Sequence, residues 1–149
     1  MNRAVRLELW GEDPVPQGSK TGFVIPGTNR VSMVDANAKK LKPWRNRIHL
    51  EAAAVMGTTP VIEGPVIVHA TFIFARPKSH YGTGKNASVL KLSSPRFKFT
   101  KPDLDKLARA VLDGITGPVV KDDAQVVDLS CVKLYGEQAG AVVVVTEMP

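Results

Sequence analysis

The sequence predicts an α/β fold of the α+β kind: one domain with a mixed sheet and two main helices, in the order β-α-β-α-β-β. Three observations indicate this fold. Several segments have the period-two or β-branched apolar pattern of strands, two segments repeat apolar residues with the helical period, and the two patterns are interleaved along the chain. Neither an internal repeat nor a linker-like segment divides the 149 residues, a length typical of one domain.

The first predicted strand covers residues 4–10, where apolar and polar side chains alternate along "AVRLELW". This period of two is typical of a strand with one buried face. The Gly- and Pro-rich segment 11–22 that follows predicts a loop, and residues 28–35 predict a short strand.

The first helix is predicted over residues 43–56. Pro43 suits the first helical turn, where its missing N–H has no helical partner, and Gly57 suits a position just beyond the end. Its apolar stripe comprises Trp44, Ile48, Ala52 and Val55.

Residues 65–77 are apolar and β-branched on both faces, which predicts a central strand. The polar segment 78–100 is too long for a neutral connector, so it is expected to be mobile or functional. The strongest helical pattern covers residues 103–117, with Gly114 or Gly117 ending the helix. Its apolar face comprises Leu104, Leu107, Ala108, Val111, Leu112 and Ile115.

The last two predicted strands cover residues 124–136 and 139–149, and we expect them to pair as a hairpin across "GEQA". The first of them contains Cys131, the single cysteine, at a position that favours a small buried side chain. A single cysteine excludes an intramolecular disulfide and a cysteine-based zinc cluster.

The chain has a formal net charge of +6, which favours a polyanionic partner such as nucleic acid. The alternative is a cationic enzyme with no polymeric partner. No apolar segment is long enough to span a bilayer, and the first residues lack the apolar core of a signal peptide. We therefore expect no membrane partner and a cytoplasmic location.

Acidic residues gather around the second predicted helix. Asp103 and Asp105 stand at its start, Asp113 lies inside it, and Asp122 and Asp123 follow it. Close carboxylates repel each other and raise each other's pKa, so their crowding indicates a counter-charge. If the chain turns back after the helix, Asp103, Asp105 and one of the adjacent pair converge. Such oxygen ligands suit Mg²⁺ or Mn²⁺, and these ions support phosphodiester hydrolysis.

Each acid also has a purely structural explanation, and the spacing leaves it open. Asp103 is suited to cap the helix, and Asp105 to form an i, i+4 ion pair with Arg109. Asp122 and Asp123 are suited to a solvated turn. Asp122 and Asp123 would point to opposite sides of an extended chain, so only one of them can join the site.

Two stretches, "KPDLDKLARAVLDGITG" at 101–117 and "KDDAQVVDL" at 121–129, together resemble the RusA family of Holliday junction resolvases. The family pattern is Asp-x-Asp before an apolar helix, an "LDAL"-like helix end, and then "DDxQV". The early "DPVPQGSK" also resembles the family's Pro-Gly-basic loop after the first strand. The resemblance is strongest over residues 101–128 and implies that residues 1–149 form one RusA-like endonuclease domain.

The resemblance implies a homodimeric, Mg²⁺-dependent endodeoxyribonuclease from a bacterial or phage-infected cell. It would resolve four-way DNA junctions by paired nicks in recombination and repair, and leave 5′-phosphates. Carried over by position, it assigns the metal ligands to Asp103, Asp105 and Asp123, with Asp122 as an accessory ligand. Together with Arg109, the first three would be the catalytic residues, and Mn²⁺ would substitute for Mg²⁺.

The sequence departs from the family pattern at two positions. Lys106 stands where the family commonly has Asn, and Arg109 stands where it has a catalytic Lys. Arginine stays protonated at neutral pH, so Arg109 is suited to stabilise phosphate charge and unsuited to transfer a proton.

Between Glu63 and Asp103 the chain contains basic residues and no acidic ones, interleaved with Tyr81, Phe97 and Phe99. Phosphate contacts from such a region give sequence-independent affinity that weakens with salt. The alternative is a solvated basic loop with ordinary core aromatics. The candidate DNA-binding residues are Lys20, Arg76, Lys78, Lys85, Lys91, Arg96, Lys98, Lys101 and Lys121.

The sequence is compatible with two other functions. The substitutions at positions 106 and 109 are compatible with a non-catalytic protein that binds branched DNA with the same fold. The same acids are also compatible with a nuclease directed at flaps or single strands.

Overall fold

The computed structural model describes residues 3–18, 20–35 and 38–149. Its main sheet contains β1 (Ala4–Trp10), β4 (Val66–Ala75), β5 (Val126–Gly136) and β6 (Gly140–Glu147) in the order β1-β6-β4-β5. Strand β6 is antiparallel to both β1 and β4, whereas β5 is parallel to β4. The sheet is therefore mixed, and the segment expected to be a central strand is β4, which pairs on both sides.

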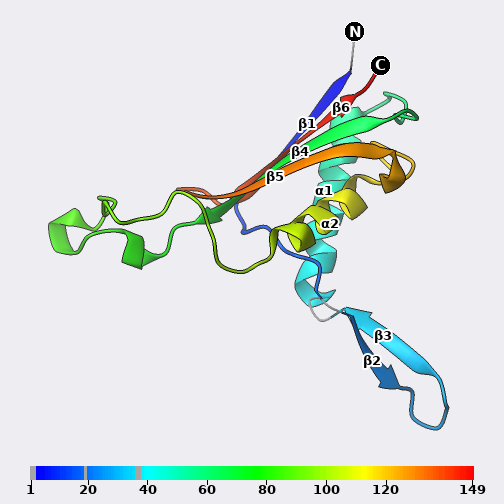
Figure 1. Ribbon diagram of the computed structural model, residues 1–149, viewed down its shortest axis with the longest axis horizontal. Coiled ribbons are helices and arrows are strands. Elements are labelled where there is room, and N and C mark those ends of the chain that lie inside the picture. Colours follow the sequence, from blue (N-terminus) through cyan, green and yellow to red (C-terminus); the bar gives the residue numbers. More distant parts are fainter. Residues whose placement is uncertain (1–2, 19, 36–37) are drawn as a thin grey trace.

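Helices α1 (Ala38–Met56) and α2 (Leu104–Ile115) both pack on the same face of this sheet (Figure 1). Fully buried side chains from the sheet and the helices form one core, to which Leu7, Phe72 and Val143 contribute from strands and Trp44 and Leu107 from helices. No helix in the described parts of the chain combines the length and the hydropathy needed to cross a bilayer. The α+β class and the two main helices predicted from the sequence are confirmed.

Helix α1 begins five residues earlier than predicted, at Ala38, so Pro43 lies inside the helix rather than in its first turn. Proline has no backbone N–H, so inside a helix it leaves out the hydrogen bond to the carbonyl one turn earlier. Burial compensates, because Leu41, one turn before Trp44, is completely buried and continues the apolar stripe towards the N-terminus. The same stripe ends on buried Met56 instead of Val55, whose side chain is 45% exposed.

Helix α2 follows its predicted apolar face closely, and it packs against α1 through Gly114. A Cβ at this position would lie 2.6 Å from Cγ2 and 2.8 Å from Cβ of Ile48. Gly114 therefore allows the two helices to approach, and it does not end α2, which continues to Ile115 just before Thr116 and Gly117.

The predicted loop over residues 11–22 is wrong at its end, because β2 (Lys20–Val24) begins there and pairs with β3 (Val31–Asp35). This two-stranded hairpin projects away from the main sheet (Figure 1). Its exposed apolar side chains include Phe23, Val24 and Met33. The β2 pattern was missed because neither face of it is buried in the domain core.

The expected hairpin across "GEQA" is also wrong, because β4 lies between β5 and β6. The short connection from β5 to β6 crosses over the end of β4, where the chain leaves the sheet. Gly136 permits this crossing, since a Cβ there would lie 2.7 Å from Cγ2 of Ile73.

Residues 76–100 form a projecting segment, which we call the arm (Figure 1). It contains the short 3₁₀ turns η1 (Lys78–His80) and η2 (Gly84–Asn86), and a bridge between Tyr81 and Leu90 holds its two sides together. The arm returns along the edge of β5, where the N–H of Tyr135 donates to the carbonyl of Arg96 over 3.0 Å. The long polar segment is thus an ordered extension of the sheet.

Candidate active site and nucleic-acid interface

Asp103 occupies the N-cap position of α2, as its sequence context predicted. Its side chain makes no capping hydrogen bond, although its backbone carbonyl accepts from the N–H of Leu107 over 3.2 Å. The helix start therefore uses the backbone of Asp103 and leaves its exposed carboxylate available for chemistry.

Asp105 lies in the first turn of α2, where the helix dipole favours a negative charge. Its carboxylate lies 3.5 Å from Nζ of Lys106, so it does not make the expected ion pair with Arg109. Arg109 instead reaches in two other directions, with Nε 3.5 Å from Asp113 and Nη1 3.0 Å from Asp123. Arg109 thus connects the flank of α2 that carries Asp105 to the segment after the helix.

Asp122 and Asp123 have different roles, because a short 3₁₀ turn, η3 (Asp123–Gln125), begins between them. Oδ1 of Asp122 accepts from the N–H of Ala124 over 2.8 Å, and Oε1 of Gln125 accepts from the N–H of Asp122 over 3.0 Å. This capping box occupies the Asp122 side chain. The Asp123 carboxylate is the one that points to α2.

The acids supply the hard oxygen donors that a divalent cation prefers. Within the described residues, however, no three His, Cys, Asp or Glu side chains lie close enough together to hold a metal ion. Cationic side chains occupy the counter-ion positions, with Lys106 beside Asp105 and Arg109 beside Asp123. The donor set fits Mg²⁺ in its chemistry, and an ion would compete with Arg109 for Asp123.

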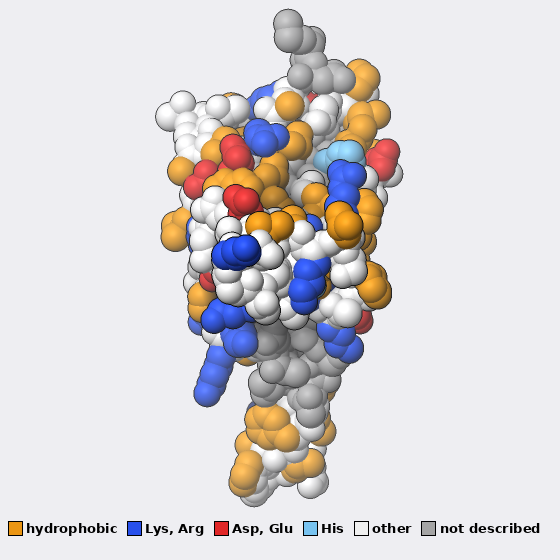
Figure 2. Space-filling view, turned by 90° about the vertical axis from the view of Figure 1, so that its left-hand side faces the viewer, with side chains coloured by type: hydrophobic (Ala, Val, Ile, Leu, Met, Phe, Trp, Pro, Cys, Tyr) orange, Lys and Arg blue, Asp and Glu red, His pale blue; other side chains and the backbone are white. Residues whose placement is uncertain are grey.

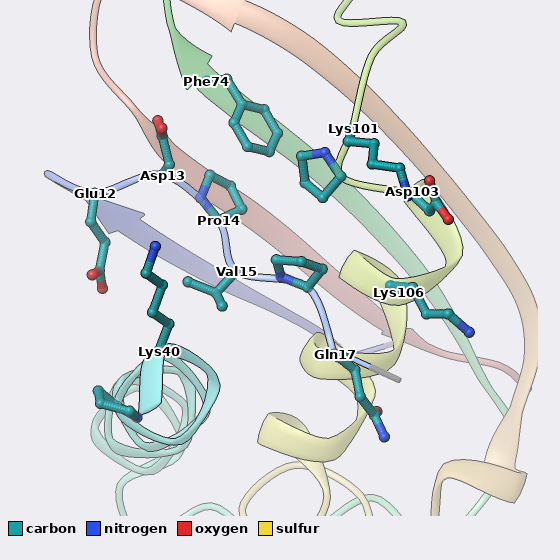
Figure 3. A pocket seen from close by; sticks show the side chains of 14 residues that line it. Glu12, Asp13, Pro14, Val15, Gln17, Lys40, Phe74, Lys101, Asp103 and Lys106 are labelled. Atoms are coloured by element: carbon teal, nitrogen blue, oxygen red, sulfur yellow. The ribbon is translucent and has the colours of Figure 1, made fainter. Parts of the chain in front are cut away.

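Asp103 lines an open groove of about 830 Å³ between the loop after β1, the start of α1 and the entry to α2. Figure 3 shows Lys101, Asp103 and Lys106 on one side of it and Glu12 and Lys40 on the other. Its apolar lining consists of Pro14, Val15, Pro16, Pro43, Phe74 and Pro102. Apolar walls with charged rims suit a nucleotide chain, which combines flat bases with charged phosphates.

The arm is tied to the sheet by its cations. Nη1 of Arg76 donates to the carbonyl of Pro95 over 2.8 Å, and its guanidinium lies 5.5 Å from the ring centre of Tyr135. Nζ of Lys98 lies 5.3 Å from the same ring. Arg76 and Lys98, both proposed as DNA contacts, therefore also hold the base of the arm.

Three exposed lysines, which we call the arm lysines, lie further out. They are Lys78, Lys85 and Lys91. Figure 2, which views the molecule from the side where the arm projects, shows separate Lys and Arg side chains across this face. Phe97 and Phe99 are 50% and 82% exposed, so they are not core aromatics. The arm is a basic surface that also presents aromatic rings.

The remaining candidate DNA contacts have different surroundings. Arg96 lies 5.3 Å from the ring centre of Phe97, and Lys101 lines the groove. Lys121 pairs with Glu63, and its hydrogen bond, reinforced by its charge, holds the pKa of that carboxyl below its usual value. Lys20 begins β2, and its side chain lies outside the part of the chain that the structure describes.

Sequence reasoning missed two residues that support the site. Gln125 donates from Nε2 to the carbonyls of Ile62 and Gly64 over 2.8 and 2.9 Å, which fixes the turn that carries Asp123. In the sequence, the Asp-x-x-Gln spacing of a capping box indicates this role of Gln125. Lys133 contacts the chain just before Asp103. In the sequence, Lys133 is recognisable as a charged residue where the strand pattern of β5 predicts an apolar one.

Comparisons with known proteins found a matching family and a similar protein. The family described as "Endodeoxyribonuclease RusA" matches residues 23–146. A Bacillus subtilis (strain 168) protein described as "Uncharacterized protein YqaN" is 31% identical over 144 residues, which cover 97% of this chain and 96% of that protein.

Proposed function

The chain belongs to the RusA family of endodeoxyribonucleases, and we propose that it resolves four-way DNA junctions by Mg²⁺-dependent paired nicks in recombination and repair. The observation that carries the proposal is the contact of Asp123 with Arg109, 3.0 Å apart, one helical turn from Asp105. This contact brings the segment after α2 back to the helix that begins at Asp103. Asp123 thereby faces the flank of α2 that carries Asp105 and Arg109, while Asp103 at the start of the same helix lines the groove.

Asp103, Asp105 and Asp123 would hold Mg²⁺ or its substitute Mn²⁺, with Asp122 as an accessory ligand because its Oδ1 already accepts from Ala124. When bound, the ion would polarise the scissile phosphate and lower the pKa of the attacking water. In-line attack of water on phosphorus would break the bond to the 3′-oxygen; the water would lose a proton to solvent, and the 3′-oxygen would take one up from solvent. The products carry a 5′-phosphate and a 3′-hydroxyl.

Arg109 has a separate part in this proposal. Its guanidinium stays charged at neutral pH, so it stabilises the extra negative charge on the phosphate in the transition state and transfers no proton. In the absence of an ion, the same charge pairs with Asp123.

DNA would reach the site along the groove and the arm. The cut strand would lie in the groove past Lys101 and Asp103, while the arm lysines would hold the phosphates of a neighbouring duplex. Such contacts recognise the shape of branched DNA without reading bases. The two-fold shape of a four-way junction favours a homodimer with one site for each nick. We propose that residues 1–149 act as one such domain in the cytoplasm of a bacterial or phage-infected cell.

A panel of labelled four-way, flapped, single-stranded and linear DNA with Mg²⁺ tests the proposal. We expect symmetric nicks in the four-way junction, and an Asp103→Asn variant that binds the junction without cutting it. Preferred cutting of flaps or single strands would instead show a nuclease directed at those substrates. Undiminished cutting by the variant would refute the site.

A second candidate function is non-catalytic binding of branched DNA. It is favoured by the fact that no three acids are gathered for a metal among the described residues, and by Lys106 and Arg109 in place of the family's residues. Retention of the junction without nicks, over a range of Mg²⁺ and Mn²⁺ concentrations, would support this function over resolution.

A further inference from the structure

Lys133 occupies a position in β5 where an apolar side chain is expected. In the pairing with β4 it stands opposite Phe72, which is fully buried on the face that the helices cover. Its neighbours on this face of β5, Cys131 and Tyr135, both pack against the core. Burying part of a charged side chain there is unfavourable unless specific partners satisfy it. A residue that breaks the local pattern in this way is expected to have a function.

The partners of Lys133 are the last residues before the proposed catalytic acids. Its Nζ donates to the carbonyl of Thr100 over 2.8 Å and to the carbonyl of Pro102 over 2.7 Å. Pro102 directly precedes Asp103 in the chain. The backbone adds a third connection, because the N–H of Lys98 donates to the carbonyl of Lys133 over 3.2 Å.

The charge of Lys133 has no acidic partner within the described residues, since both carbonyl acceptors are neutral and no carboxylate lies within ion-pair distance. An ammonium group has three N–H donors, of which these bonds use two. Lys133 therefore acts on the segment before Asp103 through these two hydrogen bonds.

We propose that Lys133 is a positioning residue, which fixes the backbone at Thr100 and Pro102 so that Asp103 enters α2 in its catalytic place. The expected slowing of cleavage rests on the proposed function. The expected loosening of the backbone before Asp103 does not. Lys133→Met removes the donors and the charge while keeping a long side chain. The matched control is Arg6→Met, which also removes a strand cation, here an exposed one paired with Glu8.

The first measurement is hydrogen exchange of the free protein, without DNA or metal. In Lys133→Met, the amides of residues 107–109, which begin the hydrogen bonding of α2 with Leu107 donating to the carbonyl of Asp103, are expected to exchange at least about tenfold faster, while β4 is unchanged. Arg6→Met should match the wild type. Unchanged exchange at residues 107–109 in Lys133→Met would overturn the proposal, whatever the protein does to DNA.

The second measurement compares single-turnover cleavage of a four-way junction with junction affinity measured without metal. Loss of positioning should slow cleavage by about 100-fold, and affinity should change by less than about threefold. An equal loss of cleavage rate and junction affinity would indicate that Lys133 contacts DNA, and it would contradict the positioning role. Absence of cleavage by the wild type would refute the proposed function, and the exchange result would still decide the structural part.

Lys133→Arg covers the case in which the methionine variant does not fold. It keeps the charge and the donors, so it should keep slow exchange at residues 107–109 and more cleavage than any neutral variant. If both variants fail to fold, Lys133 serves the stability of the domain and the proposal is wrong.

Discussion

Arg109 and a divalent cation are expected to compete for Asp123, and removing the arginine should affect metal binding and cleavage in opposite directions. In the structure Nη1 of Arg109 lies 3.0 Å from Oδ2 of Asp123, with the two side chains 53% and 31% exposed. Exposed pairs of this kind are worth about 0.2–1 kcal/mol after solvent screening. Arg109→Gln releases Asp123 from this pair, so the free protein should bind Mn²⁺ about 1.4- to 5-fold more tightly.

The same substitution should slow cleavage. Removing a charge that stabilises the transition state costs about 100- to 1,000-fold in rate, far more than the gain in metal occupancy restores. Calorimetric titration of the free protein with Mn²⁺ measures the first effect, and single-turnover cleavage at saturating metal measures the second. The control is Arg45→Gln, whose guanidinium lies 3.7 Å from Asp113 instead, and which should leave Mn²⁺ affinity unchanged.

Weaker Mn²⁺ binding by Arg109→Gln would refute this reasoning. It would mean that Arg109 holds Asp123 in place for the ion and does not compete with it. Equal Mn²⁺ affinity in the wild type and Asp123→Asn would place the ion elsewhere.

The remaining predictions concern packing, the arm and the cysteine. Gly114→Ala should destabilise the fold by about 1–3 kcal/mol in urea unfolding, because its new Cβ overlaps Ile48; equal or higher stability would contradict the close approach of α1 and α2. Replacing the three arm lysines with Gln should weaken junction binding and reduce the salt slope by about 2–3, without changing the unfolding midpoint. Burial raises the pKa of the Cys131 thiol, so at pH 8 it should react with iodoacetamide more slowly than in the urea-unfolded chain; equal rates would show an accessible thiolate.

Local patterns predicted α2 and the place of Asp103 and Asp105 at its start. The apolar period of α2 places its stripe on the core, and the Asp-x-Asp spacing marks its N-terminus, because both depend on neighbours within two turns. The adjacent pair was partly predictable in the same way. The turn that separates Asp122 from Asp123 follows from the local capping box with Gln125.

Contacts between distant segments could not be predicted from the sequence. The pairing of β4 between β5 and β6 depends on where the chain leaves the sheet, and the short connection alone favoured a hairpin. The start of α1 at Ala38 depends on burial of Leu41, which outweighs the effect of Pro43. The contact of Lys133 with the segment before Asp103 spans about thirty residues and leaves only an interrupted alternation in the sequence.

The central claim is that Asp103 and Asp123, from two segments, act in one catalytic site. Single-turnover cleavage of a four-way junction by Asp103→Asn, Asp123→Asn and the double variant tests it directly, with junction affinity measured in parallel. Residues that act as a unit give non-additive losses, so each single variant should lose at least about 1,000-fold and the double variant little more, with affinity retained. Near-wild-type cleavage by either single variant, or losses that multiply in the double variant, would contradict a shared site.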